Sequence, residues 1–250
     1  MPCLLTLRHV DYTGALRQPR HVHDALQISM LLRGGVEEMV GRVSHEGAAL
    51  HIATKDSGLA HANHWARGRS RLVRLEARDE SLGHLAAADA APAWRWRFDP
   101  VAIRAFLRLA SRPDGTEVSA DAADCCDLLA ALVARPVAHD ARTPPIWLAE
   151  VVRDLEASWT PTLDTAVLAH RANVHPVYLA RCVRRWYGVS VGDLLRRQRL
   201  RQTVAQLATS RDRLAMVAYR CGFADEAHCS RSVRAALGVS PATLRATMAV

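Results

Sequence analysis

The chain has 250 residues, of which half are hydrophobic, and its formal net charge at neutral pH is +8. This length suffices for two ordinary domains with buried cores. The sequence contains no run of eighteen apolar residues and no basic start followed by an apolar run, so we expect a soluble cytoplasmic protein and exclude the membrane-spanning and secreted classes. Its six cysteines form no CxxC pair and mostly lie in apolar helical patterns, which is typical of reduced, buried thiols.

Residues 1–80 are predicted to form an antiparallel β domain. Apolar and polar residues alternate along 26–32 and again along 71–77, which is the period of a strand with two different faces. Gly34-Gly35 is predicted to make a hairpin turn into a strand over 36–43. Several short strands at close spacing favour a small barrel or sandwich.

Residues 81–137 are predicted to be helical. One helix is expected over 99–110, because its opening Asp-Pro pair places proline where the missing N–H does no harm. A second helix is expected over 119–133. Apolar stripes on the two helices fit either an internal core or a dimerisation element, and the sequence leaves both open. Residues 138–145, which include two adjacent prolines, are the predicted linker.

Residues 146–250 are predicted to form about seven helices separated by short, well-marked turns. Proline opens a helix over 176–186, and a Ser-x-x-Asp pattern that resembles a capping box opens a long helix over 190–208. A further helix is expected over 225–237, and a Ser-Pro pair opens the last one. Two helices joined by a tight turn, the second with a basic face, form a helix-turn-helix motif, and this arrangement occurs twice.

The two motifs share a repeated sequence. Residues 181–190 and 231–240 have Arg, Val, Arg, Gly, Val and Ser at the same positions, fifty residues apart, which indicates one structural unit used twice. Residues 143–250 hold 15 arginines and 8 acidic residues, whereas residues 1–142 hold 18 basic and 17 acidic residues. A basic module attached to a near-neutral one is expected of a DNA-binding domain with a separate partner domain.

Each predicted recognition helix has a buried face and an exposed face. In the first, the residues that recur at the helical period and are expected in the core are Leu179, Cys182, Val183 and Trp186. The residues nearest the helix N-terminus enter the major groove first, and those further along contact phosphates. The predicted base-facing residues are Val177, Ala180, Arg181, Glu226, Ala227, Ser230 and Arg231, and the predicted phosphate contacts are Arg184, Arg185 and Arg234.

Residues 163–248 resemble the two-headed DNA-binding domain of AraC/XylS-type bacterial transcription regulators. The resemblance runs through Leu179-x-Arg181, Gly188-Val189-Ser190, Gly222-Phe223, Ser230-Arg231-x-Val233-Arg234 and Gly238-Val239-Ser240-Pro241. Val183, Cys229 and Val233 stand where the family usually has phenylalanine, which thins the core and leaves the groove-facing arginines intact. The resemblance implies a transcriptional activator that binds double-stranded DNA and RNA polymerase, responds to an effector and forms a homodimer.

The resemblance also implies a cupin-like sensing domain in residues 1–80. His21, His23, Gln27 and Gly34 follow the spacing of the first cupin motif, with Gln27 where metal-binding cupins have glutamate. His61 matches part of the second motif. His21, His23, Gln27 and His61 are therefore candidate ligands for a divalent transition metal, since imidazoles suit Zn, Cu, Fe or Ni. A small organic effector is the alternative occupant, and no cofactor is certain.

The predicted fold class is α+β, with an N-terminal cupin-like antiparallel β-barrel, following helices, and a C-terminal all-α domain. The leading function is a sequence-specific transcriptional regulator, not an enzyme. Two alternatives stay open. One is a cupin-type metal-dependent enzyme with an appended helical domain, and the other is an architectural protein that binds DNA without sequence preference.

Overall fold

The computed structural model describes residues 4–77, 94, 96–133, 144–157 and 159–249. By internal contacts the chain divides into two compact units, residues 1–133 together with 236–250, and residues 134–235. Of the predicted linker over 138–145, only residues 144 and 145 are described, and residues 81–93 of the predicted helical segment also lie outside the described part. The predicted domain boundaries therefore stay predictions.

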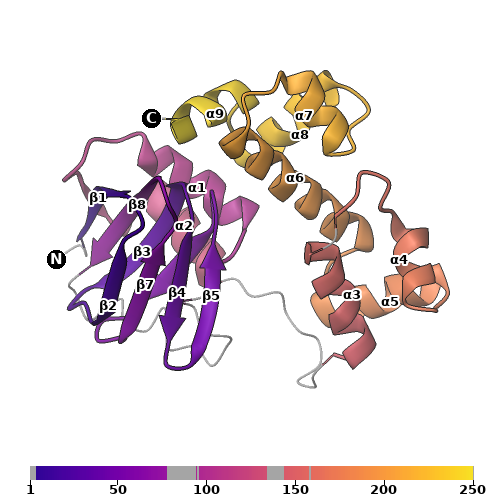
Figure 1. Cartoon of the computed structure of the whole chain (residues 1–250), viewed down its shortest axis with the longest axis horizontal. Coiled ribbons are helices and arrows are strands. Elements are labelled where there is room, and N and C mark those ends of the chain that lie inside the picture. The colour runs from indigo at the N-terminus through magenta and orange to yellow at the C-terminus, as the bar shows by residue number, and fades with distance from the viewer. Residues whose placement is uncertain (1–3, 78–93, 95, 134–143, 158, 250) are drawn as a thin grey trace. The chain divides into compact units, whose positions relative to one another are not determined.

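The first unit contains two antiparallel β-sheets (Figure 1). One has the strand order β6-β3-β8-β1-β9 and the other the order β2-β7-β4-β5. Leu31 and Leu72 of the first sheet share a core cluster with Val36 and Trp65 of the second, so the sheets pack face to face. The strands are β1 Leu4–Thr13, β2 Arg17–His21, β3 Leu26–Arg33, β4 Val36–Val40, β5 Val43–Gly47, β6 Ile52–Lys55, β7 His61–Trp65, β8 Arg69–Ala77 and β9 Glu117–Ser119.

The predicted hairpin at Gly34-Gly35 is wrong. β3 pairs with β6 and β8, whereas β4 pairs with β5 and β7, so these glycines carry the chain from one sheet to the other. Gly34 has φ +85°, and a Cβ there would lie 2.7 Å from Ser70 Cα, a close approach that only glycine allows. The predicted strand over 36–43 is also divided, because the hairpin turn falls at Gly41 with φ +61°.

Two helices complete the first unit's N-terminal part. Asp99 caps α1 (Pro100–Ala110) by accepting hydrogen bonds from the amides of residues 101 and 102, as its Asp-Pro opening predicts. Arg108 of α1 pairs with two aspartates of α2 (Ala123–Val133). Ile103 and Phe106 are fully buried. The stripe on α1 is therefore core within the chain, and the homodimer stays a prediction.

The second unit is helical, as predicted. Its helices are α3 Ile146–Ala157, α4 Thr165–Arg171, α5 Pro176–Tyr187, α6 Val191–Thr209, α7 Leu214–Arg220 and α8 Glu226–Leu237. The boundary after residue 235 falls within the last turn of α8. The last helix, α9 Pro241–Ala249, brings the described helices of the C-terminal region to the predicted seven. The α+β class is thus confirmed. Over the described residues, no helix is both long and apolar enough to cross a membrane.

Candidate nucleic-acid interface and histidine cluster

The helix α5 is held by a cap at each end and by one buried face. The His175 Nδ1 accepts from the Val177 amide at 3.3 Å, and Gly188 ends the helix in the left-handed region with φ +69°. Leu179, Cys182 and Val183 are buried, as the helical period predicts. Trp186 is only partly buried and packs against the same core. This fixed inner face determines which side chains α5 presents to solvent.

All five residues predicted on the outer face of α5 are exposed: Val177, Ala180, Arg181, Arg184 and Arg185. Sequence reasoning missed Tyr178, which is 52% exposed and stacks on Trp147 of α3 with ring centroids 5.8 Å apart. A tyrosine in the first turn, beside the predicted reader Val177, was the available signal. Its ring widens the surface that α5 presents.

The helix α8 has the same design with a different cap. Asp225 Oδ1 accepts from the His228 amide at 2.6 Å, so Asp225 caps the helix. Cys229 and Val233 are fully buried. Of the predicted outer residues, Ser230 is half-buried, and the exposed ones are Glu226, Ala227, Arg231 and Arg234. The repeat therefore places Arg181 and Arg231 at matching exposed positions of two helices.

We call α4 and α5 (165–187) the first head and α7 and α8 (214–237) the second head. The helix α6 between them has 19 residues, which at 1.5 Å per residue span about 28 Å. Its N-terminus has the predicted capping box, in which the Ser190 hydroxyl accepts from the Asp193 amide and the Asp193 carboxylate accepts from the Ser190 amide.

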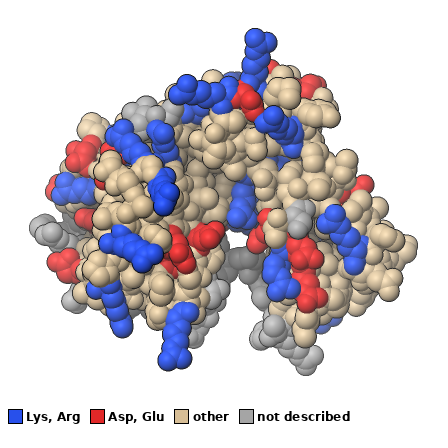
Figure 2. Space-filling model, viewed as in Figure 1, with Lys and Arg blue, Asp and Glu red and all other residues tan. Residues whose placement is uncertain are grey.

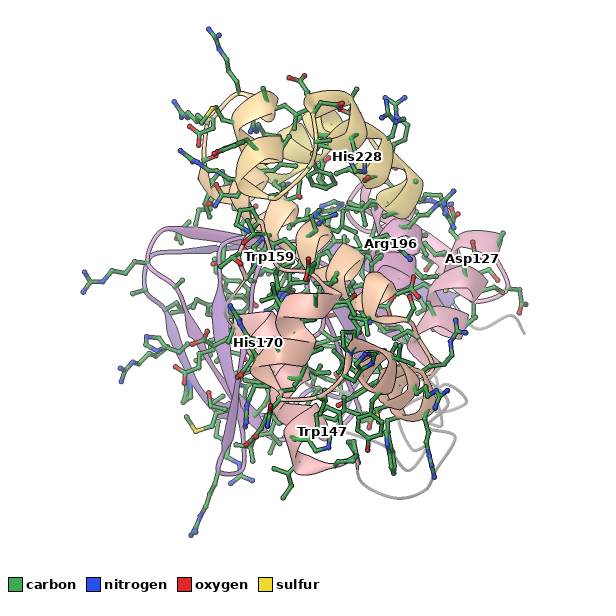
Figure 3. All side chains as sticks on the ribbon, turned by 90° about the vertical axis from the view of Figure 1, so that its right-hand side faces the viewer. Asp127, Trp147, Trp159, His170, Arg196 and His228 are labelled. Atoms are coloured by element: carbon green, nitrogen blue, oxygen red, sulfur yellow. The ribbon has the colours of Figure 1, made fainter. Side chains whose placement is uncertain are left out.

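Contacts around α6 tie the two heads together. The Arg199 guanidinium lies 5.8 Å from the Trp159 ring centroid and 5.6 Å from that of Phe223, within cation–π range of both. Figure 3 shows Trp159 beside α6 and His228 in the second head. A Cβ on Gly222 would lie 2.7 Å from the Pro161 carbonyl oxygen. The turn of the second head thus touches the segment that leads into the first.

Charge alone does not mark the interface. On the face in Figure 2, basic side chains of the second unit alternate with acidic ones. Several arginines are engaged locally, such as Arg196 with Asp193 and Arg220 with Asp212. The candidate DNA-binding surface is instead defined by the exposed faces of α5 and α8.

A second candidate site lies in the first unit. His21, at the end of β2, His23, in the loop that follows, and His61, at the start of β7, have one ring nitrogen each within 4.8 Å of the others. His21 and His61 are register partners on neighbouring strands, and their ring centroids are 4.4 Å apart. Three of the four predicted metal or effector residues therefore meet.

The protonation of these rings follows from their surroundings. The His21 Nδ1 lies 2.7 Å from the Pro19 carbonyl oxygen, and the His61 Nδ1 lies 3.0 Å from that of Leu59. Burial, with Lys55 next, lowers the pKa of His61 to about 4, and burial followed by Arg74 lowers the pKa of His23 to about 4. Near neutral pH both rings are therefore uncharged.

Gln27, the fourth predicted residue, lies on β3 in the other sheet. Its side-chain Nε2 donates to Glu76 Oε1 at 3.2 Å, and its side-chain Oε1 is buried without a hydrogen-bond partner. Sequence reasoning missed Glu38 of β4, whose Oε1 lies 3.8 Å from His61 Nε2 and 2.9 Å from Lys55 Nζ. Glu38 lies two residues after Val36 on β4, so the alternation of a strand places both side chains on the same, inward face. This alternation was the sequence signal for a buried acid.

Comparisons with known proteins bear on the helical region. Residues 168–247, from α4 to α9, match a family model described as a helix-turn-helix domain. Among curated proteins no sequence matches significantly.

Three solved structures are similar. The DNA-binding domain of AdpA, a global transcriptional factor in complex with a target DNA, is 33% identical over 42% of this chain and 92% of that one, with a TM-score of 0.37. The C-terminal domain of AraT, a response regulator from Geobacillus stearothermophilus, is 24% identical over 42% and 88%, with a TM-score of 0.39. ToxT from Vibrio cholerae is 10% identical over 98% of both chains, with a TM-score of 0.39. Because these TM-scores are low, the assignment of a helix-turn-helix domain rests on the match to the family model.

Proposed function

We propose that this chain, a DNA-binding regulator whose residues 168–247 form an AraC-type helix-turn-helix domain, reads two successive major-groove segments of duplex DNA with α5 and α8. The observation that carries the proposal is the pair Arg181 and Arg231, exposed at repeat-related positions on two helices with buried inner faces. A lone arginine on a helix is usually only solvated, whereas a duplicated one in a duplicated motif favours a shared task.

The readers and the anchors differ in position along each helix. Arg181 and Arg231 have the reach for bidentate contacts to guanine, each worth about 1–3 kcal/mol of discrimination. Val177 and Ala180 are small and apolar, which suits contact with a thymine methyl group. Further along α5 and α8, the arginines at 184, 185 and 234 are assigned to phosphates, which position the protein without specifying sequence.

The spacing of the heads supports simultaneous binding. Recognition helices on one face of a duplex enter successive major grooves about 34 Å apart. The helix α6 is about 28 Å long, a length compatible with this separation. The contacts of Arg199 with Trp159 and Phe223 favour a fixed separation.

The first unit is assigned to regulation. Two packed antiparallel sheets with buried polar side chains such as Gln27, Glu38 and Asn63 suit a cupin-like domain that binds a small effector or a metal ion. By the family resemblance, the regulator is an activator that works as a homodimer with RNA polymerase.

A gel-shift titration with the DNA upstream of the chain's own gene tests the proposal. We expect tight binding to a site of about two major-groove segments, with an affinity that falls steeply with salt. Arg181→Ala should relax preference at one base position, while Arg184→Ala should weaken all sequences alike and reduce the salt slope by about one. Arg153→Ala, which removes an exposed arginine from α3, is the matched control and should change neither. Equal affinity for random DNA would favour an architectural protein, and no DNA binding would favour the enzyme alternative.

A further inference from the structure

Three imidazoles from different parts of the first unit each bring one ring nitrogen within 4.8 Å of the other two. His21 and His61 come from neighbouring strands β2 and β7, and His23 comes from the loop after β2. We propose that His21, His23 and His61 bind one divalent transition-metal ion. This proposal concerns the first unit alone and stands whether or not the second unit binds DNA.

The hydrogen bonds of the His21 and His61 rings engage Nδ1 and leave Nε2 available to a metal ion. A carbonyl oxygen only accepts, so the contacts of His21 Nδ1 with Pro19 and of His61 Nδ1 with Leu59 place the ring proton on Nδ1. Each Nε2 then carries a lone pair, which is what a metal ion needs. Metal-binding histidines commonly donate their other N–H to a backbone carbonyl, which fixes the tautomer and the ring orientation.

The lone pair on His61 Nε2 accepts no hydrogen bond from the described residues. His61 is 1% exposed, and its Nε2 is buried without a hydrogen-bond partner. The nearest charged atom, Glu38 Oε1 at 3.8 Å, would form an ion pair only with a protonated ring. A buried nitrogen lone pair without a hydrogen-bond donor costs stability, and a bound cation would satisfy it.

The cluster needs little movement to close. Nitrogen ligands about 2.0–2.1 Å from one ion lie roughly 3–3.4 Å apart, whereas the three nitrogens lie within 4.8 Å of one another. The most widely separated pair therefore has to approach by no more than about 2 Å. Because β2 is an edge strand and His23 lies in a loop, the His21 and His23 side chains can supply this shift without disturbing the core.

The donor set selects the class of metal. Three imidazoles suit Zn, Cu, Ni, Co or Fe, and they disfavour Mg and Ca, which require oxygen ligands. Glu38 is the nearest acidic oxygen, but it lies 2.9 Å from Lys55 Nζ and would have to leave that ion pair to bind. We therefore assign Glu38 to neutralising Lys55 beside the site, and not to the ligand set.

The test is a Co(II) titration of the full-length protein, purified without a histidine tag and stripped with a chelator. We expect one equivalent to bind with visible Co(II) absorption bands, Zn(II) to displace it, and the melting temperature to rise with either ion. Excess Mg(II) should neither displace Co(II) nor raise the melting temperature. Absence of Co(II) bands together with less than stoichiometric bound Zn(II) would overturn the proposal.

Matched variants locate the site. His23→Ala and His21→Ala should weaken Co(II) binding by more than the roughly 10–100-fold that loss of an outer-shell partner causes. His61 is buried, so its variant tests folding as well, whereas His23 lies in a loop and its variant should keep the native circular dichroism spectrum. His64→Ala is the control, because His64 lies on the same strand as His61 and outside the cluster. Equal loss in His64→Ala and His23→Ala would show surface binding and refute the site.

Discussion

Replacing Gly222 with alanine should uncouple the two heads. Gly222 has φ +76°, a conformation that costs a residue with a Cβ about 1–2 kcal/mol. The added methyl group would also lie 2.7 Å from the Pro161 carbonyl oxygen and 3.1 Å from its Cα. Both contacts are with backbone, so the strain cannot be relieved by rotating a side chain, and overpacking of this kind costs about 1–3 kcal/mol.

The two effects together predict that Gly222→Ala lowers the free energy of unfolding of the second unit by about 2–5 kcal/mol. Urea unfolding followed by circular dichroism measures this change, since α3 to α8 dominate the helical signal. Affinity for a site that engages both heads should fall, because the α5–α8 separation is no longer fixed. Gly192→Ala is the control in the same unit. Gly192 lies in the first turn of α6 and its nearest neighbour is the flexible end of Arg196, so alanine should be neutral or stabilise by up to about 1 kcal/mol. A Gly222→Ala protein within 0.5 kcal/mol of wild type, on the order of ordinary surface substitutions, would refute the packing argument.

Three further predictions concern the second unit. Ser190→Ala removes the N-cap of α6 and should lower the free energy of unfolding by about 1 kcal/mol in urea titrations. The pKa of Asp193 is lowered to about 2, first by the hydrogen bonds from Ser190, so its stabilisation is present above about pH 4 and is lost as pH falls through 2. Because Asp193 is half exposed, acid titration of stability should show a loss of at most about 1 kcal/mol, and Ser190→Ala should flatten it. Cys229 is buried and its pKa is raised to about 11 by burial, so in the native protein it should resist thiol reagents that label the exposed Cys126. Rapid labelling of Cys229 in the native protein would contradict this burial.

The helical region was predictable because its signals are local. Proline at 176, the Ser190–Asp193 capping box and Gly188 determine where helices begin and end without reference to distant parts of the chain. The predicted helix over 225–237 ends where the structure has it and begins one residue too early, since Asp225 is its cap and Glu226 its first helical residue. The exposed arginines then follow from the period of the helix alone.

The β domain was less predictable because its contacts depend on strand order. The resemblance to two cupin motifs predicted that His21, His23 and His61 lie together, and the structure brings them within reach of one another. The neighbourhood of Glu38 and Lys55 depends on β4 pairing with β7 and on β6 pairing with β3, and no local pattern states which strands pair. The alternation along 26–32 also predicted one polar face, whereas the polar side chains of β3, Gln27 and Ser29, are buried like the apolar ones.

The repeat finally explains why the two heads should bind DNA unequally. The first turn of α5 contains no acidic residue, whereas the first turn of α8 contains Glu226. An acid there favours the helix by about 0.3–1 kcal/mol through the helix dipole, but Asp225 already satisfies an orphan amide as the cap. The helix stability that Glu226 adds is therefore at most this modest amount, while its exposed charge repels phosphates and can accept only from a donor such as cytosine N4. We infer that the first head supplies most of the affinity and that the second head adjusts which sequences are bound.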